Sequence, residues 1–370
     1  MIPVLIYSGS NDRAIIAFCR YAEKAKINYL IIANGEDDII FQTSYRKKVF
    51  IVRSRNVLTI DTLLEHIKIA KAKFFSGDLF ILPSTEFLNR FLLEHQEILL
   101  TKNVSFGLCE RELYASISDK YQFAELCKKY SINIPFEYSI KPKKYPYVIK
   151  SKKYFSENKM VSEKPAIIKS PEDEIKFISK FNNEEAFFQE YIEGESFYLL
   201  FYFFKDGRYS VYSQRNLIQQ HDGGSMILCR SDDCHTDLDL VNPYLELFVK
   251  EGFFGLVMVE IKKFKGQYYM IEANPRLWGP SQLILDSEMD LFDCFAKENN
   301  LSRISTTSAY KIGTWYFWSG GLAKTQRLNK NVKFHDCSYD YFFKNYFSII
   351  EKEVYNRNDS MFIFNKENSL

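Results

Sequence analysis

The sequence predicts a mixed α/β and α+β protein, in which a small parallel α/β layer comes first and hairpin-rich α+β segments follow. Two observations carry this prediction. Strand and helix patterns alternate over residues 1 to about 105, the order typical of a parallel sheet. Further along, long apolar strands are joined by short glycine-containing turns, which is the pattern of antiparallel hairpins.

Composition limits the classes of function. The chain has 370 residues, of which 46% are hydrophobic and 26% charged, as in an ordinary folded protein. Its 49 Lys and Arg nearly balance 47 Asp and Glu, which argues against nucleic-acid and anionic-membrane partners. The longest apolar run, residues 197–204, is far shorter than the ~18 residues of a membrane helix. The seven cysteines form no CxxC pair, so we expect a cytoplasmic protein with reduced thiols.

The first hundred residues read as strand, helix and strand. "IPVLIY" predicts a strand, "NDRAIIAFCRYAEKA" a helix with one apolar stripe, and "INYLIIA" a second strand. "DLFILPS" and "TEFLNRFLLEH" repeat the strand and helix order. The turn "SGSN" after the first strand has one glycine where a dinucleotide-binding loop needs three, so we do not expect an NAD site.

The middle of the chain contains an unusual interval without glycine. "SISDKYQFAELCKKYSINIP" predicts a helix capped by Ser118 or Asp119, and "PYVIK" predicts a strand that ends at Lys150. "KPAIIKSPEDEIKFISKF" predicts a strand and then a helix, and "AFFQEY" another strand. No glycine lies between Gly107 and Gly194, and no GxxxxGK[ST] motif occurs, so the chain is not a P-loop nucleotide hydrolase.

Two hairpins are predicted next, one around Asp206-Gly207 and one around Lys265-Gly266. The second ends in "YYMIEANPRLWGP", where Glu272 and Asn274 stand two residues apart on one face of a strand. A solvated edge strand ended by proline accounts for this pattern, and so does a pair of oxygen ligands for a divalent cation. The last seventy residues form no assignable pattern.

The register of the second hairpin bears on that choice. A three-residue loop of residues 265–267 would place Phe264 opposite Tyr268, and therefore Glu260 opposite Glu272. Two facing carboxylates repel each other unless a cation lies between them, which favours a metal site. A tighter two-residue loop would separate them onto opposite faces and remove the argument.

Six segments together resemble the ATP-grasp superfamily, in particular its stand-alone carboxylate–amine ligases. In chain order they are "SDKYQF", "PYVIK", "FFQEYIEGES", "YSQRNLIQQHDGGS", "MVEIKKF" and "MIEANPRLWG", and they span roughly residues 107 to 295. The resemblance implies a pre-ATP-grasp domain at 1–106, an ATP-grasp domain of two α+β subdomains at 107–300 with a lid at about 135–192, and a C-terminal extension at 301–370.

The resemblance also implies roles for single residues. ATP would lie between the two subdomains with two Mg²⁺ ions, or alternatively Mn²⁺, on its phosphates. The implied cofactor-binding residues are Lys120, Lys150, the hinge residues Glu190, Tyr191 and Ile192, and Glu195 at the ribose. The implied metal ligands are Glu260, Glu272 and Asn274, and Arg215 would point toward the transferred phosphoryl group. Arg276, held beyond Asn274 by a proline, would sit beside the γ-phosphate.

The expected function is an ATP-dependent ligase that activates a small-molecule carboxylate as an acyl phosphate and joins it to an amine. Two alternatives stay open: carboxyphosphate chemistry like that of carbamoyl-phosphate synthetase, and a nucleotide-binding regulatory module with degenerate catalysis. The expected partners are small-molecule carboxylate and amine substrates, with room for a homodimer. The chain departs from the family in the loop "SKKYFSENKMVSEK", which lacks the usual small residues. We expect His221 to be a histidine of a surface loop rather than an acid–base group.

Overall fold

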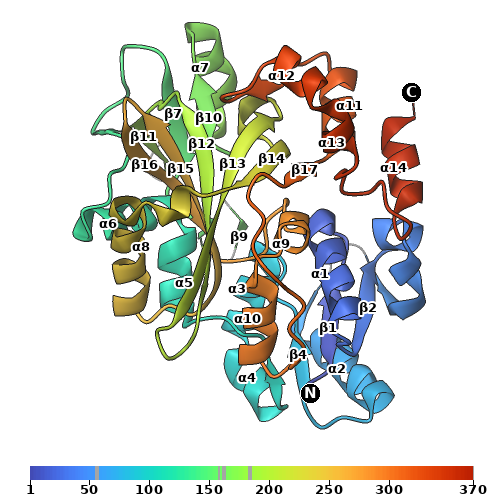
Figure 1. Cartoon of the computed structure of the whole chain (residues 1–370). Helices are drawn as coiled ribbons and strands as arrows, with labels where there is room; N and C mark the ends of the chain where they lie inside the picture. Colours follow the sequence, from blue (N-terminus) through green and yellow to red (C-terminus); the bar gives the residue numbers. More distant parts are fainter. Residues whose placement is uncertain (55–57, 157–158, 161–163, 182–185, 370) are drawn as a thin grey trace.

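The computed structural model describes residues 1–54, 58–156, 159–160, 164–181 and 186–369. Three larger sheets and a two-stranded one, β8-β9, organise the described residues. Figure 1 shows the parallel sheet at the lower right, a large sheet in the centre and the C-terminal helices along the upper right. The predicted fold class, with a parallel N-terminal sheet followed by α+β layers, is confirmed. No described helix is both long and apolar enough to cross a bilayer.

The N-terminal sheet is fully parallel and has the strand order β3-β2-β1-β4-β5. Alternation along β1 decides its two faces, because Val4 and Ile6 join one core while Leu5 and Tyr7 join the other. Helix α1 covers the first face, and helices α2 and α3 cover the second. The elements are β1 (Val4–Tyr7), α1 (Asp12–Lys24), β2 (Tyr29–Asn34), η1 (Ile39–Gln42), η2 (Ser44–Lys48), β3 (Val49–Arg53), α2 (Ile60–Phe74), β4 (Leu79–Ile81), α3 (Glu86–Glu94), α4 (Gln96–Thr101) and β5 (Val104–Ser105).

The predicted helix after residue 117 begins at Lys120. Helix α5 (Arg111–Ser118) precedes it, and α6 (Lys120–Lys129) follows, with Asp119 at the N-cap position. Asp119 makes no side-chain cap bond, because its carboxylate accepts instead from Arg90 and from the backbone N–H of Tyr154. Helix α6 therefore begins at the base of the loop that follows Lys150.

A small antiparallel sheet of order β10-β7-β11-β6 has its own core, with Tyr147, Ile149 and Ile168 fully buried. We refer to this sheet as the lid sheet. Helix α7 packs beside it, and Ser170 caps that helix by accepting from Asp173 N–H. The elements are β6 (Glu137–Tyr138), β7 (Tyr147–Ser151), β8 (Phe155–Ser156), β9 (Lys159–Met160), β10 (Ala166–Ile168), α7 (Pro171–Phe177), η3 (Ile178–Lys180) and β11 (Ala186–Glu190).

The large sheet has seven strands in the order β16-β15-β12-β13-β14-β17, with β18 added beside β13. Along β12, Phe197, Leu199 and Phe201 pack with helix α8, while Tyr198 and Leu200 face the N-terminal sheet and helix α10. The elements are β12 (Glu195–Phe203), β13 (Tyr209–Gln219), η4 (His221–Gly223), β14 (Met226–Asp232), η5 (Cys234–Thr236), α8 (Leu238–Lys250), β15 (Gly255–Phe264), β16 (Gln267–Asn274), α9 (Gln282–Asp286), α10 (Leu291–Glu298), β17 (Trp315–Phe317) and β18 (Lys333–Phe334).

The last seventy residues, which showed no sequence pattern, are built into this sheet through β17 and β18. Four helices complete them: α11 (Ser319–Arg327), α12 (Tyr339–Lys344), α13 (Tyr346–Ile350) and α14 (Met361–Asn368). Arg20 of α1 holds this segment with two 2.8 Å hydrogen bonds to the Asp359 carboxylate. The C-terminal segment therefore packs against both the large sheet and the N-terminal helix.

The hairpin between β15 and β16 corrects one prediction and confirms another. Its turn has two residues, Lys265 and Gly266, both with positive φ, and Phe264 pairs with Gln267, so the predicted three-residue loop is wrong. A bulge then shifts the register between the Ile261–Met270 pair and the Glu260–Glu272 pair. The two glutamates face each other as predicted, because the extra residue of the bulge offsets the shorter turn.

Candidate active site

A cleft with a cavity of about 420 Å³ lies between the lid sheet and the large sheet. This volume is in the range of small-molecule sites. Its walls come from distant parts of the chain. The residues that line it include Arg13, Lys120, Lys150, Tyr154, Glu190, Tyr191, Ile192, Tyr198, Met226, Met258, Glu260, Lys262, Glu272, Asn274, Arg276, Trp278, Gly279 and Lys333.

Two acids and two lysines meet in the middle of this cleft. The ammonium of Lys120 lies 3.2 Å from the Glu272 carboxylate and donates to the Tyr154 hydroxyl at 3.0 Å. Lys150 donates to the backbone carbonyl of Ile271 at 3.0 Å. Ile271 is the residue that the bulge inserts, so the same irregularity that aligns the glutamates also presents a carbonyl to Lys150.

The charges in this cluster shift one another's ionisation. Burial and the charge of Glu272 raise the pKa of Glu260 to about 7. Burial acts to raise the pKa of Glu272 as well, but Lys120, a hydrogen bond from Asn274 and Lys150 together hold it low. Burial lowers the pKa of Lys150 to about 8, while Glu272 and Tyr154 outweigh burial at Lys120 and raise its pKa. Glu272 is therefore the constant negative charge of the site.

The donor set fits a hard divalent cation. Two facing carboxylates supply oxygen ligands, and Asn274 lies on the same face two residues beyond Glu272. The Asn274 amide N–H donates to Glu272 at 3.0 Å, and its oxygen accepts from Arg276 at 2.7 Å, so the amide must turn before that oxygen can act as a ligand. No group of three or more His, Cys, Asp or Glu side chains suited to a metal occurs among the described residues. Two acids and an amide leave coordination positions for water and phosphate oxygens, as Mg²⁺ requires.

Glu190, Tyr191 and Ile192, the residues predicted to form the hinge, all line the cleft where β11 ends. The Tyr191 hydroxyl accepts from Lys333 at 2.8 Å, which ties the hinge to the C-terminal segment. The loop after Lys150 lies partly outside the described residues. Its described member Tyr154 lines the cleft through its contact with Lys120.

Glu195 and Arg215 are not brought into the cleft, which corrects their predicted roles. Arg215 pairs across the sheet with Phe197, on the face that packs toward α8 and away from Tyr198. There its guanidinium donates to Glu195 at 2.7 Å and also bonds to Asp336. Both residues were predicted to be in the site because they lie within the family-like segments. Strand alternation places their side chains on the opposite face of the sheet from Glu260. His221 begins the turn η4 and does not line the cleft.

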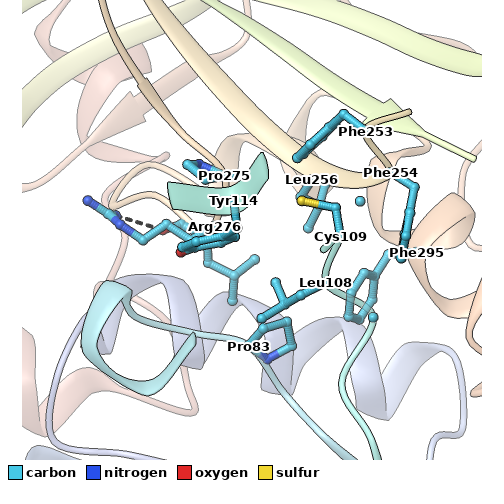
Figure 2. A pocket seen from close by; sticks show the side chains of 13 residues that line it. Pro83, Leu108, Cys109, Tyr114, Phe253, Phe254, Leu256, Pro275, Arg276 and Phe295 are labelled. Carbon is cyan, nitrogen blue, oxygen red and sulfur yellow. Dashed lines mark hydrogen bonds between the residues drawn. The ribbon is translucent and has the colours of Figure 1, made fainter. Parts of the chain in front are cut away.

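Arg276 lines the cleft, as the sequence suggested, and donates to Asn274 and to the Leu277 carbonyl. Its aliphatic stem also borders a second cavity of about 10 Å³, room for roughly one water molecule. Figure 2 shows that the guanidinium extends away from the Phe253, Phe254 and Phe295 side of this small cavity. Its charged end therefore belongs to the large cleft.

The motifs did not indicate several polar residues of the cleft, among them Arg13, Tyr154, Lys262 and Lys333. Lys262 had a signal, since it alternates in phase with Glu260 on β15. Arg13 and Lys333 had none, because they lie far along the chain from every motif and reach the cleft only through tertiary packing.

No protein-family model matches the chain, and no similar curated protein was found. Solved structures match its fold. Pyruvate carboxylase from Rhizobium etli aligns with a TM-score of 0.62 and 15% identity over 85% of this chain, which spans 30% of that longer chain. The biotin carboxylase domain of Hydrogenobacter thermophilus 2-oxoglutarate carboxylase, solved with MgADP, ADP and bicarbonate, aligns with a TM-score of 0.60 and 14% identity. The alignment covers 85% of this chain and 73% of that domain's chain. An L-amino acid ligase from Bacillus licheniformis aligns with a TM-score of 0.57 and 14% identity, over 81% of this chain and 74% of the ligase chain.

Proposed function

We propose that this chain, which has the ATP-grasp fold, is an ATP-dependent ligase that activates a small-molecule carboxylate and joins it to an amine. The observation that carries the proposal is the facing of Glu260 and Glu272 beside Lys120 and Lys150 in the cleft between the lid and large sheets. The matched structures support it, since they include an amino acid ligase and a carboxylase domain bound to MgADP.

The nucleotide would lie along the cleft with its base at the hinge of residues 190–192 and its phosphates at the acid and lysine cluster. Lys120 and Lys150 are buried donors beside that position and would contact phosphate oxygens. Glu260, Glu272 and, after its amide turns, Asn274 would hold Mg²⁺ or Mn²⁺. When bound, the ion offsets phosphate charge during transfer.

The chain's own residues would position and stabilise the reaction rather than react covalently. The substrate carboxylate attacks the γ-phosphorus, and the bond to ADP breaks as the acyl phosphate forms. Arg276 would stabilise the charge on the transferred phosphoryl group, since its guanidinium lies beside Asn274. The amine then attacks the acyl carbon and phosphate leaves, which forms the amide.

Phosphate release from ATP in the presence of Mg²⁺ and a panel of carboxylic acids tests the proposal, with and without hydroxylamine. We expect one or more acids to stimulate release and hydroxylamine to trap the acyl phosphate as a hydroxamate. Stimulation by bicarbonate alone would favour carboxyphosphate chemistry instead. Nucleotide binding without acid-dependent turnover would favour a regulatory module. The domain division at residues 106 and 300 is part of the same proposal.

A further inference from the structure

One end of the cleft carries hydrogen-bond donors without acids. The acids that line the cleft within the described residues are Glu190 at the hinge and Glu260 and Glu272 in the middle. Another part of the cleft wall is formed by Arg13, by residues 278–280 and by residues 223–226. It presents positive and neutral donors to whatever enters from that side.

One donor at this end has no partner within the described part of the chain. The indole N–H of Trp278 is buried and unpaired, and the residue is only 2% exposed. The Nε of Arg276 makes no hydrogen bond, but it lies 3.8 Å from the Glu86 carboxylate and forms an ion pair with it. Buried donors are normally satisfied, so the unpaired indole N–H beside a cavity points to an acceptor supplied by a ligand.

Arg13 brings a full positive charge to the same end from the N-terminal helix α1. Its Nη1 donates to the Met226 carbonyl and to the Tyr316 hydroxyl, each at 3.1 Å, and its guanidinium stacks over Trp318 at 3.8 Å. These contacts hold the plane of the guanidinium. Among the described residues, its Nε and Nη2 atoms form no ion pair or hydrogen bond, so these donors can bind a ligand.

Within the described residues, Arg13 makes no hydrogen bond to an acid. Two acids act on it through their charges: Asp12, its neighbour along α1, and Glu367, whose carboxylate accepts from the Trp318 indole N–H at 2.9 Å. Neither acid bonds to the guanidinium, so Arg13 keeps donor capacity for an anion in the cleft.

Gly279 makes this placement of Arg13 sterically allowed. A Cβ atom at residue 279 would lie 2.9 Å from Nη2 of Arg13, too close for any real contact. The glycine in the "LWGP" turn thus leaves room for the guanidinium to lie against the backbone of the cleft wall. A larger residue there would push Arg13 aside.

We propose that Arg13 binds a second anionic group of the acceptor substrate, a carboxylate or a phosphate, so that the acid activated by this enzyme carries two anionic groups. One group would lie at Arg276 and the acid and lysine cluster, where it is phosphorylated, and the other at Arg13. This inference rests on the proposed ligase function and adds the substrate class. It also makes the N-terminal domain a part of the binding site.

The test measures melting temperature of the full chain with Mg²⁺ and a non-hydrolysable ATP analogue. The probes are malonate, succinate, glutarate and 3-phosphoglycerate, each beside its singly charged counterpart, namely malonamate, succinamate, glutaramate and glycerate. The variants are Arg13→Met, which keeps an unbranched apolar stem without the charged guanidinium, and Gly279→Ala, which keeps the charge but displaces it. Lys24→Met is the matched control, because Lys24 lies on the same helix with a side chain 52% exposed.

We expect at least one probe with two anionic groups to stabilise the wild-type chain and Lys24→Met more than its counterpart does. In Arg13→Met and in Gly279→Ala this difference should disappear, with the affinity for that probe lowered by about tenfold or more. Gly279→Ala keeps the test decisive if Arg13→Met does not fold. The inference is overturned if no probe with two anionic groups is preferred, or if the preference survives both substitutions.

The nucleotide analogue separates this inference from the proposed function. Stabilisation by the analogue and Mg²⁺ without any acid reports nucleotide binding, and its absence counts against the ligase proposal. The difference between paired acids reports a site for the second anionic group, since both members of a pair carry the carboxylate that would be activated, and its loss in the two variants assigns that site to Arg13.

Discussion

At the scale of single residues, Glu272 is the side chain on which the charge balance of the cleft depends. It lies 3.2 Å from Lys120, faces Glu260 across the hairpin and accepts from Asn274. Its low pKa keeps it ionised at neutral pH, whereas that of Glu260 is raised to about 7. A neutral residue at position 272 would leave two buried lysines with a single, partly protonated acid.

We predict that Glu272→Gln abolishes Mg²⁺-dependent turnover while the chain still folds cooperatively. Loss of one preorganised electrostatic contact costs ~10²–10³ in rate, and this residue serves both lysines and the metal. The measurement is phosphate release at saturating Mg²⁺ beside a melting curve. The control is Glu125→Gln, since Glu125 pairs with Lys128 on the surface of α6. Near-full activity of Glu272→Gln would refute the metal assignment.

Arg276 offers a second residue-scale prediction. Its two terminal nitrogens donate to Asn274 at 2.7 Å and to the Leu277 carbonyl at 3.1 Å, which fixes the plane of the guanidinium. Lysine keeps the charge but cannot make both bonds, so Arg276→Lys should lower kcat/KM by ~10-fold or more, within the ~1.5–3 kcal/mol of a charged hydrogen bond.

Steady-state phosphate release with the identified acid measures this effect, and melting temperature should barely change. Arg208→Lys is the matched control, because Arg208 forms an exposed pair with Asp206. Unchanged kinetics together with a lowered melting temperature would assign Arg276 a structural role.

At the scale of elements, a bulge in β16 and a close backbone approach before β12 position the site. The bulge at Ile271 puts Glu272 opposite Glu260 and gives its carbonyl to Lys150. A regular strand after the two-residue turn would have turned Glu272 to the other face. The close approach of Gly194 to β15 similarly fixes where the hinge meets the large sheet.

Gly194→Ala should disturb that junction. A Cβ at this position would lie 2.1 Å from the Lys263 carbonyl oxygen, and a backbone atom cannot move aside as a flexible side chain can. We expect a stability loss of about 1–3 kcal/mol, typical of overpacking, and weaker nucleotide binding because the hinge at 190–192 shifts.

Urea unfolding and nucleotide titration measure the two effects. Gly77→Ala serves as the control, because a Cβ there would meet no atom within 4 Å. If Gly194→Ala matches that control in both measurements, the junction does not set the position of the hinge.

At the scale of the whole molecule, the C-terminal segment joins parts that are far apart in sequence. Asp359 accepts two hydrogen bonds from Arg20 and one from the Tyr45 hydroxyl at 2.6 Å. Arg357 holds Asp286 of α9 through both of its terminal nitrogens. These contacts tie residues 355–360 to the N-terminal sheet layer and to the turn beyond the cleft.

Asp359→Asn should therefore destabilise the entire fold. The Arg20 side chain is only 10% exposed, so removing its partner leaves a buried charge at a cost of about 3–5 kcal/mol. Urea unfolding measures the loss. The control is Glu246→Gln, part of an exposed pair with Lys250, which should cost no more than about 0.5 kcal/mol. Equal effects of the two substitutions would contradict the prediction.

The same ion pair gives a pH dependence. Burial acts to raise the pKa of Asp359, but the hydrogen bond and charge of Arg20 lower it to about 2, below the ordinary value of 3.8. This contribution is therefore complete above about pH 4 and is lost as pH falls toward 2. The stability of the wild-type chain should fall more steeply than that of Asp359→Asn across this interval, as followed by melting temperature. Parallel curves would show that the pair contributes little.

The sequence by itself determined what local periodicity encodes. Alternation of apolar residues predicted the strands of the N-terminal sheet and the hairpins, and it placed Glu272 and Asn274 on one face of a strand. A strand's period of two fixes which side chains share a face, whatever the strand packs against. The facing of Glu260 and Glu272 was predicted from the wrong turn length, and the bulge restored it.

Only the tertiary structure decided which faces and which distant residues meet. It turned Arg215 and Glu195 to the far face of the large sheet, and it brought Arg13 from the first helix and Lys333 from the last seventy residues into the cleft. The physical reason is that a face acquires its role from what packs on it, and burial against distant segments is a property of the whole fold. The bulge at Ile271 belongs to the same class, because a one-residue change of register depends on long-range pairing that no local pattern records.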